Sequence, residues 1–182
     1  DLPTGKNMAG AFYQPKAVYI DINYLKTLPR AEVLAGLAEI IKHGLIKDKS
    51  LFGYIETHLG LLLKRDEKAL LYAITRNVEI KAGIVQADER EQGLRKILNF
   101  GHTIGHAIES LTCYQRYTHG EAVAIGMVVE SLLSERKGLL ASVQRMRITG
   151  LLNQAGLPTR LPIIPTKKIF LELAKDKKAT RG

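Results

Sequence analysis

From Pro29 onward, apolar residues recur every three to four positions, which is the period of α-helices that pack along one side. In the segment PRAEVLAGLAEIIKHGLIKD, one helical face carries Val33, Leu37, Ile40, Ile41 and Leu45. Residues 68–88 and 96–111 repeat this period. The first half of HGEAVAIGMVVESLLSERKG is apolar on nearly all sides, which predicts a buried helix. This pattern predicts a mostly α fold.

The two ends of the chain complete the expected architecture. Residues 1–22 are rich in turn residues, and AVYID alternates like a short strand. Two further helices are expected near Ala141–Gln154 and Lys167–Lys178, separated by the stretch Pro158–Pro165. A length of 182 residues suits one domain. We therefore predict a single domain over 1–182, with an extended or β segment at 1–22 and an α-helical part at 23–182.

Composition excludes several classes of partner. No apolar run reaches the roughly 18–20 residues of a membrane helix, and no signal peptide is recognisable, so we expect no membrane partner. The single cysteine, Cys113, excludes an internal disulfide and a multi-cysteine metal site, and it suits a reducing cytoplasm. The net charge of +9 is spread along the chain without an aromatic and basic RNA motif. It predicts a site for a small polyanion, and no nucleic acid.

Four polar residues would share one narrow face if the helix around His102 reaches back to Arg95. They are Arg95, Asn99, His102 and His106. Solvated helix faces are usually Glu and Lys, so this set indicates a binding site. Two histidines at i and i+4 can hold one metal ion. A third, His119, opens the buried helix, where the N-terminus disfavours a protonated ring; an ordinary capping residue is the alternative.

Three other positions admit two interpretations. Lys81 falls within the apolar stripe of its helix, so it must meet an anion or extend its ammonium to solvent. Glu39 and Lys42 lie opposite the apolar face of their helix, where periodicity predicts a surface ion pair. The PTGKN segment reads as a turn, because it lacks the second Gly and the Lys-Ser/Thr ending of a P-loop.

Taken in order, four segments resemble the 3-dehydroquinate synthase family. They are DLPTGKNMAGAFYQP, then TLPRAE with GLAEIIKHG, then KAGIVQADEREQGLRKILNFGHTIGHAIE, and finally HGEAVAIGM. The later Asp-Lys-Lys is also similar. The resemblance implies NAD and Zn²⁺ or Co²⁺ as cofactors and a homodimeric, cytoplasmic enzyme of the shikimate pathway. The implied reaction converts 3-deoxy-D-arabino-heptulosonate 7-phosphate to 3-dehydroquinate with loss of phosphate.

The resemblance also implies a role for each matching residue. The metal ligands are Glu39, His102 and His119. This set replaces the pairing of His102 with His106 that their i, i+4 spacing suggested. The catalytic residues are His106, Lys42 and Asn99. The substrate contacts are Asn7, Lys81, Arg95 and Lys177. The NAD contacts are Lys6, Tyr24, Leu25, Lys26 and Thr27.

The chain departs from the family in two ways. It has no Gly-rich dinucleotide turn after a strand. We therefore expect the N-terminal Rossmann-like half, which carries most of the NAD site in the family, to be a missing partner. We also expect the isolated chain to be inactive. The family's Gly-Tyr-Gly before His-Gly-Glu reads Cys113, Tyr114 and Gln115 here. Three alternatives remain: another sugar phosphate cyclase, a metal-dependent polyol dehydrogenase of related fold, and a non-catalytic truncated domain.

Overall fold

The computed structural model describes residue 10 and residues 13–179, with side chains up to residue 174. Its elements in chain order are η1 (Ile22–Lys26), α1 (Arg30–Lys47), α2 (Lys49–Leu63), α3 (Glu67–Ala87), η2 (Leu94–Asn99), α4 (His102–Leu111), α5 (His119–Arg136), α6 (Ser142–Gln154) and α7 (Thr166–Ala179). The described residues contain no strand. The expected mostly α fold, including the two late helices, is confirmed. None of the described helices is long and apolar enough to cross a bilayer.

Short polar side chains fix where several helices begin. Asp48 accepts hydrogen bonds from the first amides of α2, and Asp66 accepts one from an amide of α3. Thr118 and Glu121 form a reciprocal capping box at the start of α5. Each cap satisfies amides that a helix leaves without an intrahelical partner. The cap at Thr118 matters most here, because it sets the position of His119, the first residue of α5.

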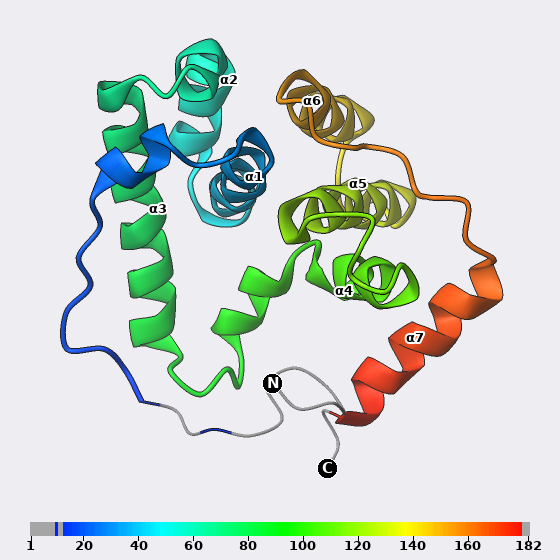
Figure 1. The fold of residues 1–182 in the computed structure, drawn as a ribbon. Helices are drawn as coiled ribbons and strands as arrows, with labels where there is room; N and C mark the ends of the chain where they lie inside the picture. The colour runs from blue at the N-terminus through cyan, green and yellow to red at the C-terminus, as the bar shows by residue number, and fades with distance from the viewer. Residues whose placement is uncertain (1–9, 11–12, 180–182) are drawn as a thin grey trace.

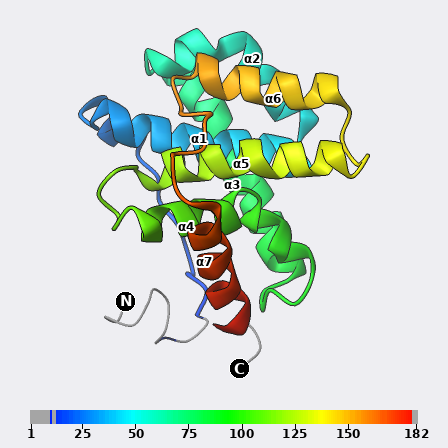
Figure 2. The same ribbon diagram turned by 90° about the vertical axis from the view of Figure 1, so that its right-hand side faces the viewer.

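Helix α5 lies at the centre of the molecule, between α6 and α4, with α1 alongside (Figures 1 and 2). Its residues from Ala122 to Ile125, and Met127, have no exposed surface, which confirms the expected buried helix. Helix α1 contacts α5 on one side and α2 and α3 on the other, while α7 packs on α4. A main apolar cluster joins α1, α2, α3, α5 and α6, and a smaller one joins α4 to α5.

Glycines let the backbones around α5 approach closely. A Cβ at Gly120 would overlap the backbone of Ala35 in α1, and one at Gly126 would overlap the carbonyl of Gly101. A Cβ at Gly105 in α4 would lie 3.2 Å from the backbone of Ala122. Only glycine allows such contacts without displacing a helix. They bring the starts of α4 and α5 close to the middle of α1.

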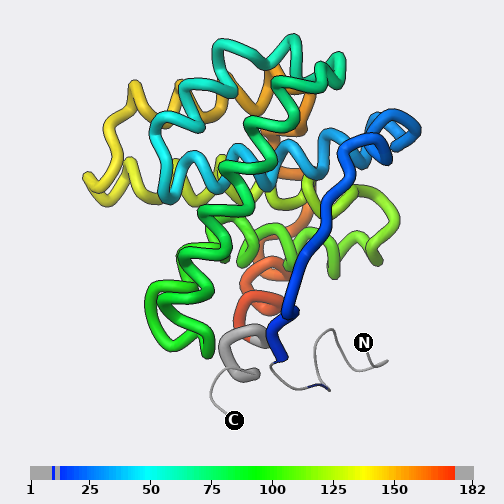
Figure 3. The backbone as a smooth tube through the Cα atoms, turned by 90° about the vertical axis from the view of Figure 1, so that its left-hand side faces the viewer, coloured from blue at the N-terminus to red at the C-terminus, as the bar shows by residue number. Residues whose placement is uncertain are grey.

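The strand expected at AVYID is not formed in the described chain. Residues 13–20 are extended and run along the outside of the helical body to η1 (Figure 3). Val18, Tyr19 and Ile20 are exposed. A strand needs a neighbour to complete its ladder, and the described residues supply none. Asp21 instead accepts from the amide of Asn23 and caps η1.

Candidate metal centre

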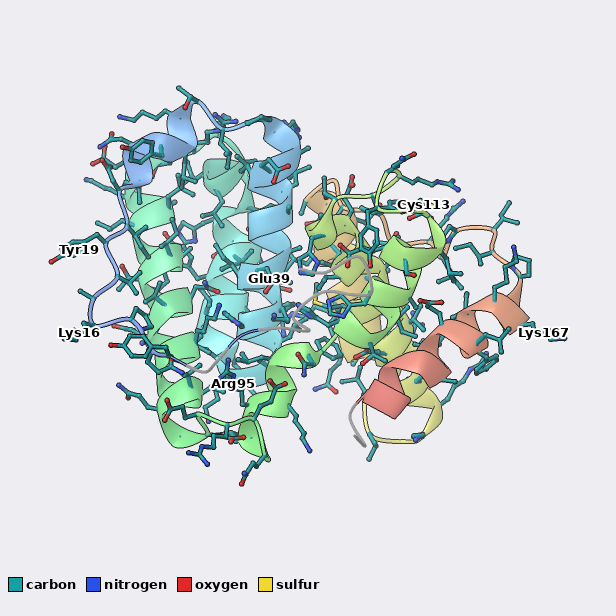
Figure 4. All side chains as sticks on the ribbon, turned by 60° about the horizontal axis from the view of Figure 1, so that its bottom comes forward. Lys16, Tyr19, Glu39, Arg95, Cys113 and Lys167 are labelled. Carbon is teal, nitrogen blue, oxygen red and sulfur yellow. The ribbon has the colours of Figure 1, made fainter. Side chains whose placement is uncertain are left out.

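Three helices each contribute one potential metal ligand to the same point. Glu39 lies in the middle of α1, His102 is the first residue of α4, and His119 is the first of α5. The Oε1 atom of Glu39 lies 3.5 Å from Nε2 of His102 and 3.7 Å from Nε2 of His119. Figure 4 shows Glu39 pointing from α1 toward α4 and α5. The structure therefore brings together three residues that are distant in the sequence.

The geometry of these three side chains fits a divalent cation. Oε1 of Glu39 is buried and accepts no hydrogen bond from the described residues. A buried acceptor without a partner costs free energy, and a cation would remove that cost. Metal bonds of about 2.0–2.1 Å at tetrahedral angles place two ligand atoms roughly 3.3 Å apart, close to the observed separations. Two histidines and one carboxylate leave a coordination position open for substrate or water.

The local charges favour the metal-binding protonation states. Burial raises the pKa of the Glu39 carboxyl, but the ammonium of Lys42, 2.6 Å from Oε2, and the two histidines outweigh this and leave it lowered. Burial, assisted by the charge of Lys42, lowers the pKa of His102 to about 4. An ionised carboxylate and a neutral imidazole are the forms that bind a metal.

A polar cleft of about 320 Å³ opens beside the three ligands. Its lining residues are Glu39, Lys42, His43, Lys81, Glu91, Arg95, Leu98, Asn99, His102 and His119. Three of them are Lys or Arg, so the cleft suits an anionic ligand that also reaches the metal position. Seven of the site residues expected from the resemblance line this cleft; His106 lies next to it, with its ring 5.4 Å from that of His102. Their individual roles stay predictions.

The helix around His102 does not reach back to Arg95, so the condition for the shared helical face is not met. Arg95 and Asn99 lie on η2, and the chain turns at Gly101, with φ of 80°, before α4 begins at His102. A helix cannot continue through this left-handed residue. Arg95, Asn99 and His102 still line one cleft. Asp88 accepts from the amides of Gln92, Gly93 and Arg95 and holds the loop before η2.

The structure bears on the two interpretations of Lys81 and corrects the one given for Lys42. Lys81 is exposed to solvent, although it reaches the cleft. The buried face of this part of α3 is formed by Ile80 and Ile84, and Lys81 lies outside it. Lys42, read from periodicity as a surface residue, is buried, with 3% of its surface exposed. Helix α1 is covered on two sides, and periodicity assumes only one buried face.

Sequence reasoning missed three residues near the centre. Glu91 lines the cleft and accepts a 2.7 Å hydrogen bond from Asn99. The ring of His43 is buried and contacts the side-chain oxygen of Asn77 on α3. Glu109 contacts His119. The helical register could have found Glu109, because it follows His106 by three residues on the same face; no pattern marks Glu91 or His43.

Several expected contacts lie elsewhere. Tyr24, Leu25, Lys26 and Thr27 belong to η1, which packs on α3, and none of them lines the cleft. Their role in NAD binding stays a prediction. Lys6, Asn7 and the side chain of Lys177 lie outside the described residues. In the loop that replaces the family's Gly-Tyr-Gly, Cys113 and Tyr114 have φ of 53° and 56°, a left-handed conformation that glycine adopts at lower cost.

Fold and site together define a class of protein: a helical domain in which three helices supply an open two-histidine, one-carboxylate centre beside a basic cleft. The family profile described as 3-dehydroquinate synthase C-terminal matches residues 36–179, and the one described as 3-dehydroquinate synthase N-terminal matches residues 1–35. The chain belongs to the 3-dehydroquinate synthase family. The boundary between the two matches falls inside α1.

Relatives and solved structures agree with this assignment. The chain is 52% identical over 176 residues to 3-dehydroquinate synthase of Citrifermentans bemidjiense, covering 97% of this chain and 49% of that protein. It is 51% identical over 182 residues to that of Caldanaerobacter subterraneus, covering 100% of this chain and 51% of that protein. The chain thus spans about half the length of these relatives.

Two solved structures share the fold. One is ValA, the 2-epi-5-epi-valiolone synthase of Streptomyces hygroscopicus, with NAD⁺ and Zn²⁺ bound; the TM-score is 0.80 and the identity 31%, covering 87% of this chain and 44% of that chain. The other is 2-deoxy-scyllo-inosose synthase complexed with carbaglucose-6-phosphate, NAD⁺ and Co²⁺. The TM-score is 0.64 and the identity 28%, and the match covers 96% of this chain and 47% of that chain.

Proposed function

We propose that this chain is the metal- and substrate-binding part of a 3-dehydroquinate synthase. The activity is the cyclisation of 3-deoxy-D-arabino-heptulosonate 7-phosphate to 3-dehydroquinate with release of phosphate. The observation that carries the proposal is the convergence of Glu39, His102 and His119 at a cleft that also presents Lys42, Lys81 and Arg95. The names of the relatives support the choice of substrate. We further propose that most of the NAD site lies in the N-terminal half of the complete enzyme. We also propose that the complete enzyme is a homodimer in the cytoplasm.

The site residues other than the metal ligands have separate tasks in this proposal. Lys81 and Arg95 bind the substrate carboxylate by charge, and Arg95 is held for this by Asp88 and by its own bond to the carbonyl of Glu89. Lys42 and Asn99 contact the substrate hydroxyls. His106, on the open side of the histidine cluster, transfers a proton. When bound, Zn²⁺ or Co²⁺ supplies Lewis acidity, and NAD supplies a transient oxidation.

Another sugar phosphate cyclase is the second candidate, favoured by the likeness to the two solved structures. A carboxylate on the substrate distinguishes the two, because the cleft presents the two cations Lys81 and Arg95. A substrate that reacts equally well without its carboxylate would favour the second candidate.

The test measures phosphate release and metal content in the complete protein that contains this chain. We expect Arg95→Ala to remove a charge-assisted hydrogen bond of roughly 1.5–3 kcal/mol, which is about a ten- to hundredfold loss of substrate affinity, with the metal retained. We expect His102→Ala to lose both the metal and turnover. Full turnover by metal-free protein would show that the proposal is wrong.

A further inference from the structure

Glu109 is a buried carboxylate that none of the proposed roles uses. It lies in the last turn of α4 with 4% of its surface exposed. Both of its carboxylate oxygens are 3.3 Å from Nδ1 of His119, while Nε2 of the same ring faces Glu39. The ring of His119 is therefore held between one carboxylate on α4 and another on α1.

This arrangement determines which nitrogen of His119 can bind a metal. A neutral imidazole has one N–H donor and one lone pair, and an ionised carboxylate only accepts. With its proton directed to Glu109 from Nδ1, the ring offers the lone pair of Nε2 toward Glu39. His102 is arranged in the same way, with Nδ1 3.2 Å from the carbonyl oxygen of Phe100 and Nε2 toward Glu39.

We propose that Glu109 is a positioning residue for the metal centre: it accepts the Nδ1 proton of His119, fixes the ring's tautomer and angle, and strengthens Nε2 as a ligand. This rests on the metal site proposed above. The close approach of Gly105 to Ala122 brings α4 near enough to α5 for Glu109 to reach the ring. The rival interpretation is direct ligation, because His106, Glu109 and His119 also lie within ligand distance of one another.

The experiment titrates the complete protein that contains this chain with Co²⁺, following the visible absorption of the bound ion and its affinity by competition with a chelator. We expect Glu109→Ala to weaken the single site about 10–100-fold and to change its absorption spectrum. Glu109→Gln keeps an acceptor oxygen and should recover part of the affinity. Ser110→Ala is the matched control: it removes the neighbouring bond to Glu172, leaves Glu109 in place, and should bind Co²⁺ as the wild type does.

Wild-type affinity and spectrum in Glu109→Ala, with folding verified by circular dichroism, would overturn the proposal. So would the loss of a second Co²⁺ equivalent with the first unchanged, which would make Glu109 a ligand of another ion. If Glu109→Ala does not fold, the same two measurements are made on Glu109→Gln. A Co²⁺ affinity and spectrum equal to those of the wild type would then overturn the proposal. A wild-type chain that binds no Co²⁺ would instead refute the metal site itself, as would unchanged binding by His102→Ala.

Discussion

Glu130 shows how one side chain on α5 supports the start of α4. Gly101 precedes α4 and has no side chain to cap it, and Oε2 of Glu130 accepts the Gly101 amide at 2.9 Å. The other oxygen, Oε1, is buried without a partner among the described residues. Burial raises the pKa of Glu130, although the amides of Gly101 and Ile104 partly oppose this. The carboxylate thus stabilises the start of α4 at a cost in desolvation.

This raised pKa predicts a pH-dependent effect of Glu130→Gln. A carboxyl whose pKa is higher in the folded than in the unfolded protein takes up a proton on folding. Its contribution is most favourable below the ordinary pKa of 4.5 and declines as the pH rises toward the folded-state value. The free energy of unfolding of the wild type relative to the variant should therefore fall above about pH 4.5. Urea unfolding of both proteins from pH 4 to 8 measures this; a difference that grows with pH would contradict it.

Glu39 and Lys42 mark the limit of sequence periodicity at single residues. Their register on α1 predicted an exposed pair, whereas Lys42 is buried because α1 contacts α5 as well as α2 and α3. Which second face a helix buries depends on a partner far along the chain, and a local pattern cannot contain that information. Only the family resemblance pointed to Glu39 as a ligand.

At the scale of elements, the helices were predictable and their interruptions were not. The helical period placed α1, α3, α5, α6 and α7 close to where they lie. The break at Gly101 is set by the tight contact of Gly101 with Val123 and Met127 of α5, which is a tertiary effect. The strand expected at AVYID failed for a related reason, since a strand is defined by its neighbour.

The space beside each glycine predicts opposite effects for Gly→Ala variants in α5 and α6. Gly120→Ala places a Cβ against the backbone of Ala35, which must push the start of α5 away from α1. We expect a loss of about 1–3 kcal/mol in stability and weaker metal binding, because His119 adjoins Gly120. Gly150→Ala in α6 meets open space and should stabilise by about 0.5–1 kcal/mol. Urea midpoints and Co²⁺ affinity check both; a Gly120 variant that binds and unfolds like the Gly150 variant would contradict the prediction.

At the scale of the whole molecule, a bound metal would join α1, α4 and α5. Because binding occurs only in the folded state, a metal at 100 times its Kd stabilises by about 2.7 kcal/mol. For a chain of this size that corresponds to a rise in Tm of about 5–10 °C. We expect Zn²⁺ to produce this shift and a chelator to reverse it. His102→Ala should show no shift.

Mg²⁺ is the control for this measurement, because it prefers oxygen ligands and an octahedral shell; it should leave the Tm unchanged. A wild-type Tm that is the same with and without Zn²⁺ would contradict the prediction. The single-domain interpretation of residues 1–182 also stays a prediction, and one cooperative transition in the same melting curve would support it.

The central position of α5 also determines when the metal centre can form during protein synthesis. During synthesis, α1, α2 and α3 leave the ribosome before α5, so the side of α1 that packs against α5 is without that partner at first. At about 5–20 residues per second, the delay between α1 and α5 is on the order of ten seconds. His119 arrives only with α5, and hence the metal centre cannot be assembled on the early helices. We expect the nascent chain to acquire its metal late, after the α1–α5 contact has closed.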